Sequence, residues 1–307
     1  METQVAGFNS QGVLSVVQLA TGDQNTFEYI SSGAAIKREL ITVKEVNEGG
    51  VVNTLMVINN SDHFVFFMDG DILAGAKQNR VLNTSLLLAP QSKTGIPVSC
   101  VEQGRWRHVS PNFSSTDYIA PVAMRSAKAQ KVSMNLKERL SFAADQSEVW
   151  HGVAEFQSAS GVESRTSNLS DVYEKKRLEL EKFVTNFIPI EGANGVAFFL
   201  GQDLVTIDLF NRTDVFSEYL PKMLRGIGLE AMVLKEGKKT VHEAEAKFRV
   251  LDLLDRVGAV EAQTFPGAAA GEEKRFDVEQ YSGFELGYGE RRIHTAVLKG
   301  RTTPRRV

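Results

Sequence analysis

Polar and charged side chains are concentrated in residues 69–84, and their types suit the binding of an anion or a metal ion. The stretch begins with Asp69-Gly70-Asp71 and continues through Lys77-Gln78-Asn79-Arg80 to Asn83. Two carboxylates around a glycine offer hard oxygen ligands, and a Mg²⁺ held by them would bridge to a phosphate. Asp-Gly is also a standard turn after a strand, in which the carboxylates only accept backbone hydrogen bonds. Both interpretations stay open.

The segment Lys77–Arg80 lies between predicted strands, where long polar side chains are costly to bury without partners. Their donors match phosphate or carboxylate oxygens, although simple solvation at the surface is a competing interpretation. The expected ligand-binding residues of this stretch are Lys77, Gln78, Asn79, Arg80 and Asn83. Asp69 and Asp71 are the expected general bases or metal ligands.

A second polar stretch runs from Ser99 to Trp106. Cys100 would be a nucleophile if a neighbouring base or arginine lowered its pKa, but Glu102 on the same strand face disfavours the thiolate. A lone strand cysteine is more often an inert core residue. Trp106, with arginines on both sides, is suited to stacking on a base or sugar ring. The candidates here are Cys100 and Glu102 for catalysis, and Gln103, Arg105 and Trp106 for ligand binding.

Charge is distributed unevenly along the chain. Residues 75–137 hold nine Lys or Arg against two acidic residues, a surplus of +7 in a chain whose net charge is −3. A basic segment in an acidic chain indicates a local anion site rather than a coat for polyanions such as nucleic acid. Lys128, Lys131 and Lys137 have helical spacing, so for these three we expect the solvated face of a helix.

Length and composition narrow the class of protein. The 307 residues have ordinary hydrophobic and charged fractions, 42% and 24%, which exclude a disordered or collagen-like chain. No apolar run approaches the ~20 residues needed to span a bilayer, and no signal peptide is visible, so a cytoplasmic protein is expected. One cysteine and five scattered histidines supply no zinc motif, and no phosphate-binding or dinucleotide loop is present.

Short strands are predicted for the first third of the chain, which must position the polar residues. Runs rich in β-branched and aromatic residues occur at 13–19, 26–30, 40–46, 52–59, 64–68, 82–88 and 96–101. The turn at 59–62 predicts a hairpin between 52–59 and 64–68. Because the connections are too short for parallel crossovers, we expect an antiparallel β-sandwich or open barrel.

Beyond Pro121 the apolar period changes from two to about 3.6, which indicates helices. Helices are predicted around 132–140, over 169–187, and over 215–227 with a kink at Pro221. A capping box at Asp145 and Glu148 predicts the start of another helix. A second capping box, at Thr240 and Glu243, predicts the start of a helix that ends at Gly258. Phe248 is expected on the apolar face of the last of these. A hairpin is expected over 195–200 and 204–209, and strands at 260–264, 276–280 and 292–298.

The predicted fold class is therefore α+β. A β-rich part would occupy 1–120, an α+β part 121–300, and a disordered basic tail 301–307. One α+β domain over 1–300, with the terminal strands in a shared sheet, is the alternative.

The two polar stretches resemble a domain family named for its association with ADP-ribosylglycohydrolases and rhodanese-phosphatases. The similarity is carried by Asp69-Gly70-Asp71, Gly75–Arg80, Asn83-Thr84-Ser85 and Val98–Trp106, with weaker matches at Gln146, Trp150, Ser164 and Thr166. Asp71 departs from the family pattern, in which glutamate is common. The likeness extends from about Phe27 to Leu298. Because the family has no established activity, the resemblance implies only a neighbourhood of ADP-ribose and phosphoryl chemistry.

Charge and resemblance together predict that the protein binds a small anionic metabolite. ADP-ribose or NAD-related nucleotides are the preferred class, with hydrolysis as an option and Mg²⁺ as an optional cofactor. The alternative is a non-catalytic ligand-binding or protein-interaction domain whose polar residues form a structural network. Neither a membrane nor a nucleic-acid partner is expected.

Overall fold

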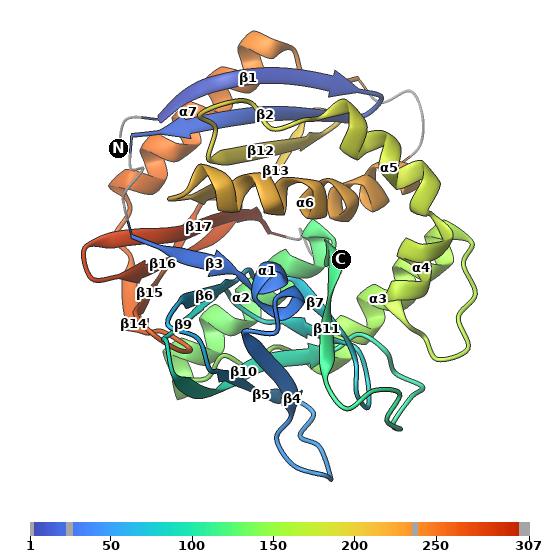
Figure 1. Cartoon of the computed structure of the whole chain (residues 1–307). Coiled ribbons are helices and arrows are strands. Elements are labelled where there is room, and N and C mark those ends of the chain that lie inside the picture. Colours follow the sequence, from blue (N-terminus) through green and yellow to red (C-terminus); the bar gives the residue numbers. More distant parts are fainter. Residues whose placement is uncertain (1–2, 23–26, 235–238, 301–307) are drawn as a thin grey trace.

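The largest sheet of the protein combines strands from both ends of the chain (Figure 1). The computed structural model describes residues 3–22, 27–234 and 239–300. The order in this eight-stranded sheet is β1 (Thr3–Gln11), β2 (Leu14–Thr21), β12 (Gly195–Leu200), β13 (Asp203–Phe210), β17 (Arg291–Lys299), β16 (Tyr281–Tyr288), β15 (Glu272–Val278) and β14 (Gln263–Pro266). Every neighbouring pair is antiparallel. The pairing of β2 with β12 joins strands from the two sides of residue 120.

Two smaller sheets carry the polar stretches. The six-stranded sheet has the order β11 (Phe113–Ile119), β7 (Asp71–Gly75), β8 (Arg80–Leu82), β10 (Ser92–Cys100), β5 (Thr54–Asn59) and β4 (Ile41–Glu45). The three-stranded sheet has the order β3 (Tyr29–Ser31), β6 (Phe64–Phe67) and β9 (Leu86–Leu88). Strand β10 pairs with β5 up to Pro97 and with β8 from Val98 onwards.

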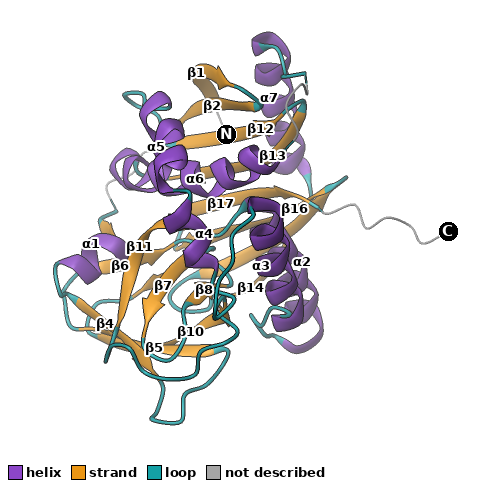
Figure 2. Ribbon diagram, turned by 90° about the vertical axis from the view of Figure 1, so that its right-hand side faces the viewer, coloured by secondary structure: helices purple, strands orange, loops and turns teal. Residues whose placement is uncertain are grey.

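The helices of the described residues are α1 (Ser32–Lys37), α2 (Val122–Arg139), α3 (Gln146–Ser160), α4 (Leu169–Lys175), α5 (Arg177–Asn186), α6 (Thr213–Val233) and α7 (Glu243–Ala259). Helices α6 and α7 pack on opposite faces of the large sheet, whereas α1 contacts strands of the two smaller sheets and α3 contacts β10. Alternate residues of each strand face opposite sides, so Phe198 packs with α6 while Phe199 packs with α7. Helix α6 runs between the large sheet and the smaller sheets (Figures 1 and 2). No helix in the described ranges combines the length and apolarity needed to cross a membrane.

Several predicted elements are confirmed. The fold is α+β, and strands β12 and β13 form the expected hairpin. Asp145 caps α3, because its carboxylate accepts hydrogen bonds from the backbone N–H groups of Ser147 and Glu148. These predictions are confirmed because each depends on a strong local signal. The hairpin has a two-residue turn, and the helix has a capping side chain.

Other predictions are wrong, and long-range pairing explains most of them. The 59–62 turn does not close a hairpin, since β5 pairs with β4 and β10 while β6 pairs with β3 and β9. The β3–β6 pair is parallel, which short connections had argued against. The predicted strand 82–88 is two strands in different sheets, separated by Asn83-Thr84-Ser85.

The helices also differ from the prediction in detail. The segment 169–187 divides into α4 and α5 at Lys176, and α6 runs from Thr213 to Val233, beyond both ends of the predicted 215–227. Helix α7 begins after His242 without a side-chain cap, so the box at Thr240 does not form. Phe248 is 69% exposed and lies outside the core. The basic tail 301–307 lies outside the described residues.

Candidate functional site

The polar residues predicted to form one site belong to four separate groups. We call them the Arg80 cluster, the Glu102–Arg105 pair, the Asp69 network and the Asp71 cluster. A tight turn at Gly70, whose φ is +83°, separates the two predicted carboxylates, so Asp69 bonds to Arg125 of α2 whereas Asp71 bonds to Lys222 of α6.

The Arg80 cluster consists of Arg80, Gln78, Cys100, Glu45 and Trp106. The Arg80 guanidinium is fully buried and donates from Nη1 to Gln78 Oε1 at 3.0 Å and to Cys100 Sγ at 2.9 Å. Its Nη2 lies 3.6 Å from the Glu45 carboxylate. The half-exposed Trp106 ring stacks on the guanidinium at 5.5 Å. Burial raises the pKa of the Cys100 thiol, so the thiol is protonated at neutral pH and out of contact with solvent.

The Glu102–Arg105 pair holds two loops together. Arg105 donates from Nε to Glu102 Oε1 at 2.8 Å and from Nη2 to Oε2 at 2.6 Å, and its Nη1 donates to the Ala76 carbonyl at 2.6 Å. The Thr166 hydroxyl and the Asn79 N–H donate to the same carboxylate. Burial opposes ionisation, but these bonds prevail and hold the pKa of Glu102 below its usual range. Both side chains are therefore engaged within the protein.

The remaining predicted ligand residues also have partners inside the protein. Lys77 donates to the carbonyls of Glu48 and Gly49, and its ammonium lies over the Trp106 ring, 5.5 Å from the ring centre. The Asn79 side chain donates to Asn168 and Ser170. The Asn83 side chain donates to the Phe142 carbonyl and accepts from the Ser99 hydroxyl. Gln103 is exposed, and its backbone carbonyl accepts a hydrogen bond from the Gln78 side chain. Among the weaker family matches, Gln146 bonds the backbone N–H and C=O of Cys100. The ligand roles of these residues stay predictions.

The Asp69 network is centred on Arg125, which lies in the basic segment 75–137 but outside both polar stretches. Its guanidinium donates to Asp69 at 2.9 Å and to Asp208 at 2.6 Å, and all three side chains are buried. His294 lies 3.3 Å from Asp208 and bonds Ser85 through Nδ1 at 2.9 Å. Despite burial, Arg125 and His294 hold the pKa of Asp208 well below its usual range.

Asp69, Asp208 and His294 are the one group in the described ranges with the residue types and spacing for a metal ion. Their donor set does not fit a cation, because the Arg125 guanidinium already bonds both carboxylates. A divalent ion there would face a buried positive charge.

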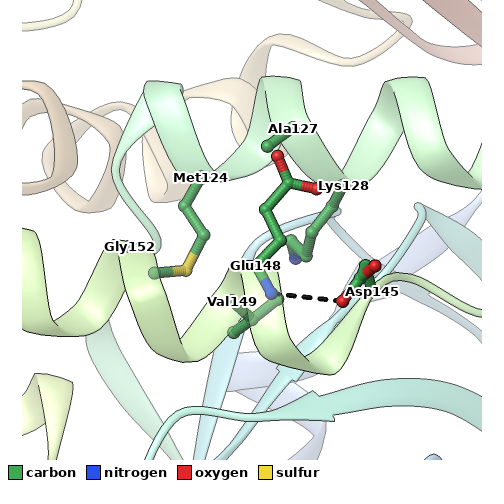
Figure 3. Close-up of a pocket in the computed structure, with 7 residues that line it drawn as sticks. All are labelled: Met124, Ala127, Lys128, Asp145, Glu148, Val149 and Gly152. Atoms are coloured by element: carbon green, nitrogen blue, oxygen red, sulfur yellow. Dashed lines mark hydrogen bonds between the residues drawn. The ribbon is translucent and has the colours of Figure 1, made fainter.

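Lys128 lies beside this network, and its position differs from the one expected from the sequence. It was expected on a solvated helix face, but it is 2% exposed and donates to the Leu82 carbonyl. Burial lowers its pKa to about 7. Lys128 also lines a small cavity of about 10 Å³ between α2 and α3, together with Met124 and Glu148 (Figure 3). That volume suits a single water molecule and no larger ligand.

The Asp71 cluster joins β7, α1 and α6. The Asp71 carboxylate accepts hydrogen bonds from Lys222 Nζ at 2.6 Å, Tyr219 Oη at 2.9 Å, Ser32 Oγ at 3.0 Å and the Met68 N–H at 3.1 Å. Burial, with the nearby Asp71 charge, raises the pKa of Tyr219 well above its usual value, so Tyr219 stays a neutral donor. Four donors on one buried carboxylate make Asp71 an anchor for the side chains around it.

A cavity of about 300 Å³ opens between α1 and α6 beside this cluster. We call it the α1–α6 cavity. Its lining residues are Ser31, Gly33, Ala34, Lys37, Thr116, Glu218, Tyr219 and Lys222. Two of them, Tyr219 and Lys222, bond directly to Asp71. Asp71, a predicted catalytic residue, thus has hydrogen-bond partners that line a cavity of ligand size. Sequence reasoning missed Tyr219 and Lys222 because helix α6 carries no recognisable motif.

The fold and these buried charges define an α+β protein with an internal polar core. Residues 2–298 match the family model of the ARG and Rhodanese-Phosphatase-superfamily-associated Protein domain. Because the match covers nearly the whole chain, the protein belongs to that family. The resemblance predicted from the two polar stretches is therefore confirmed. No curated protein and no solved structure matches the chain.

Proposed function

We propose that the protein binds a small anionic metabolite in the α1–α6 cavity. The observation that carries this proposal is the Lys222 ammonium, held 2.6 Å from the buried Asp71 at the wall of a cavity of about 300 Å³. An ammonium has three donors, and Asp71 takes one of them. Lys37 adds a second positive charge to the lining.

The neutral groups of the lining complement this charge. Ser31, Thr116 and Tyr219 bring hydroxyl groups, which suit the hydroxyls of a sugar as well as a phosphate. The volume lies at the lower end of the range for small-ligand sites. A phosphorylated ribose, or that portion of an ADP-ribose or NAD-related nucleotide, is therefore the class proposed. The association recorded in the family description favours the same class.

Hydrolysis is the chemical step proposed for this cavity. Asp71 is poorly suited to act as a base, because Lys222 and three further donors stabilise its charge. Glu218 is an exposed carboxylate of the lining and accepts a hydrogen bond from Ser31. It is the residue proposed to activate a water molecule.

The test is a thermal-shift panel with inorganic phosphate, ribose 5-phosphate, AMP, NAD and ADP-ribose, each with and without Mg²⁺. A ligand present at ~100 times its dissociation constant should stabilise the protein by about 2.7 kcal/mol, a clear rise in Tm. Lys222→Gln keeps a donor for Asp71 but loses the charge, so the rise should disappear. Lys247→Gln on α7 is the matched control and should leave the rise intact.

Outcomes of this panel separate binding from catalysis. If a ligand binds, release of product measured by chromatography should fall in Glu218→Gln while the Tm rise persists. Binding without turnover would remove the hydrolytic step and keep the binding site. A rise that persists in both Lys222→Gln and Lys37→Gln would contradict the α1–α6 cavity as its location.

A structural role for the polar motifs is the second candidate function. It is favoured by Arg105 and Arg125, because both guanidinium groups donate their hydrogen bonds to carboxylates and carbonyls inside the protein. Under this proposal the chain is a non-catalytic or protein-interaction domain, and no member of the ligand panel changes its Tm.

A further inference from the structure

The α7 face of the eight-stranded sheet contains a groove with a volume of about 740 Å³. Near its N-terminus α7 packs closely on the sheet, with Ala246, Val250 and Leu253 buried. Farther along, Leu254 and Val257 are only partly buried, and they line the groove together with residues of β13, β15, β16 and β17. We call this site the α7 groove. Its volume falls inside the range of sites for small organic ligands.

Helix α7 lines the groove with one stripe of its surface. Leu251, Leu254, Asp255 and Gly258 follow one another at i, i+3, i+4 and i+7, so they lie on the same side of the helix. At a rise of about 1.5 Å per helical residue, this stripe is about 10 Å long. A Cβ atom added at Gly258 would meet no heavy atom within 4 Å outside its own stretch of helix. The stripe is therefore long enough for an extended alkyl chain, and there is open space at its end.

Apolar side chains form much of the lining of the α7 groove. Leucine and valine side chains come from the helix and from the residues that follow it, and two further apolar side chains belong to the facing sheet. They are Leu251, Leu254, Val257 and Val260 on the helix side, and Leu209 and Phe276 on the sheet side. Water in contact with such surface is displaced favourably by an apolar molecule.

The charges of the lining cancel. They belong to two cations, Lys274 and Arg292, and to two carboxylates, Glu285 and Asp255. Lys274 pairs with Glu285 at 3.1 Å, and the Thr295 hydroxyl donates to the same carboxylate from the next strand. A charged ligand in this groove would lose hydration without meeting a net opposite charge. The lining therefore favours an uncharged ligand.

We propose that the α7 groove binds an uncharged single-chain molecule, such as a fatty alcohol, whose alkyl chain lies along the stripe from Leu251 to Gly258. The apolar side chains, the length of the stripe and the cancelled charges all support this class of ligand. The α1–α6 cavity differs, because polar and charged side chains dominate its lining. The two sites therefore take different ligands, and the failure of either proposal would leave the other standing.

Fluorescence titration of the whole chain with phenylnaphthylamine, an uncharged apolar dye, tests this proposal. We expect saturable binding of one dye per chain and its displacement by octanol. Octanoate and octyltrimethylammonium have chains of similar length with heads of opposite charge, and both should displace the dye much less effectively than octanol. Gly258→Leu places a side chain on the stripe and should weaken dye binding about tenfold or more. Its Tm should be unchanged or higher, because leucine favours a helix more than glycine does.

Two further variants separate the groove from other apolar surface. Phe248 is an exposed apolar residue of α7 that does not line the groove, so Phe248→Ser is the matched control and should bind the dye normally. Leu254→Asn removes apolar surface from the stripe and should weaken binding, while circular dichroism reports whether this variant is folded. If it does not fold, Gly258→Leu decides.

Four results would overturn the proposal. They are dye binding that does not saturate, displacement by either charged amphiphile as effective as that by octanol, unaltered binding in Gly258→Leu, and loss of binding in Phe248→Ser.

Discussion

The Lys128 ammonium lies in the core beside Arg125, and desolvation holds its pKa at about 7 instead of 10.5. Between these two values the unfolded chain binds a proton that the folded protein does not. Stability should therefore rise with pH from 7 towards 10.5, by up to about 1.4 kcal/mol per pH unit. Below pH 7 both states carry the proton, and this contribution no longer changes with pH.

Urea unfolding at pH 7, 8 and 9 measures this slope. Lys128→Met should remove most of it and should be more stable than the unaltered protein at pH 7, because no buried charge remains. Lys131→Met, three residues along α2, serves as the control and should keep the slope. An unchanged slope in Lys128→Met would show that other groups produce it.

Removing the Arg125 charge should destabilise the protein, unlike removing the Lys128 charge, because Asp69 and Asp208 compensate the Arg125 charge. Arg125→Met leaves Asp69 and Asp208 buried without their cation, so we expect a loss of about 3–5 kcal/mol in the free energy of unfolding. Arg139→Met, on the exposed C-terminal turn of the same helix, should change stability by less than about 0.5 kcal/mol. Denaturant titration compares the two, and equal losses would contradict a buried charge network.

At the scale of elements, helix α3 depends on its N-cap. Asp145→Ala should cost about 1 kcal/mol, because the N–H groups of Ser147 and Glu148 lose their acceptor. Asp145→Asn should recover most of the loss. Thr240→Ala, at the capping box that does not form, should be neutral. Urea unfolding of these variants checks the contrast, and a large loss in Thr240→Ala would mean that a cap forms there after all.

Tertiary packing overrides a local sequence signal in one element, and a local polar signal prevails in another. Pro221 lacks an N–H and is expected to kink α6, and the helix continues past it to Val233, as the predicted helix over 215–227 requires. Leu220, Leu224 and Ile227 bury one face of α6 against the large sheet, and this burial outweighs the lost hydrogen bond. In the segment 82–88 the local polar residues prevail over the strand pattern. Asn83 bonds Ser99 and Phe142, so the strand breaks at the polar residues.

At the scale of the whole molecule, the eight-stranded sheet makes distant parts of the chain interdependent. Strand β2 pairs along its length with β12, which lies beyond residue 190. A fragment of residues 1–120 would expose Val16, Val17 and Leu19, which are buried in the whole protein. We expect this fragment to lack cooperative unfolding and to aggregate.

Calorimetry of the whole chain should instead show one main transition. A soluble fragment 1–120 with native-like near-UV circular dichroism would contradict this expectation and favour two separate domains.

Local chemistry explains what was predictable from the sequence. A capping aspartate, a two-residue turn and the helical period act over a few residues, so α3 and the β12–β13 hairpin were foreseen with the α+β class. The family resemblance likewise rests on contiguous motifs. These motifs correctly marked unusual polar residues, because side chains such as Arg80 and Glu102 are costly to bury and stand out by type.

Glu102 has a partner three residues away in Arg105, but other buried charges have partners that only the tertiary structure decided. Arg125 bonds Asp208 across 83 positions of sequence, and Lys222 bonds Asp71 across 151. No local pattern encodes such pairs, since they depend on which strands and helices pack together. The sequence by itself determined which charges this protein carries and their concentration in residues 75–137. Burial decided that Arg105 is neutralised inside the protein by the nearby Glu102. Long-range pairing decided that Arg125 bonds Asp208, and that Lys222 bonds Asp71 at the wall of a cavity that Lys37 also lines.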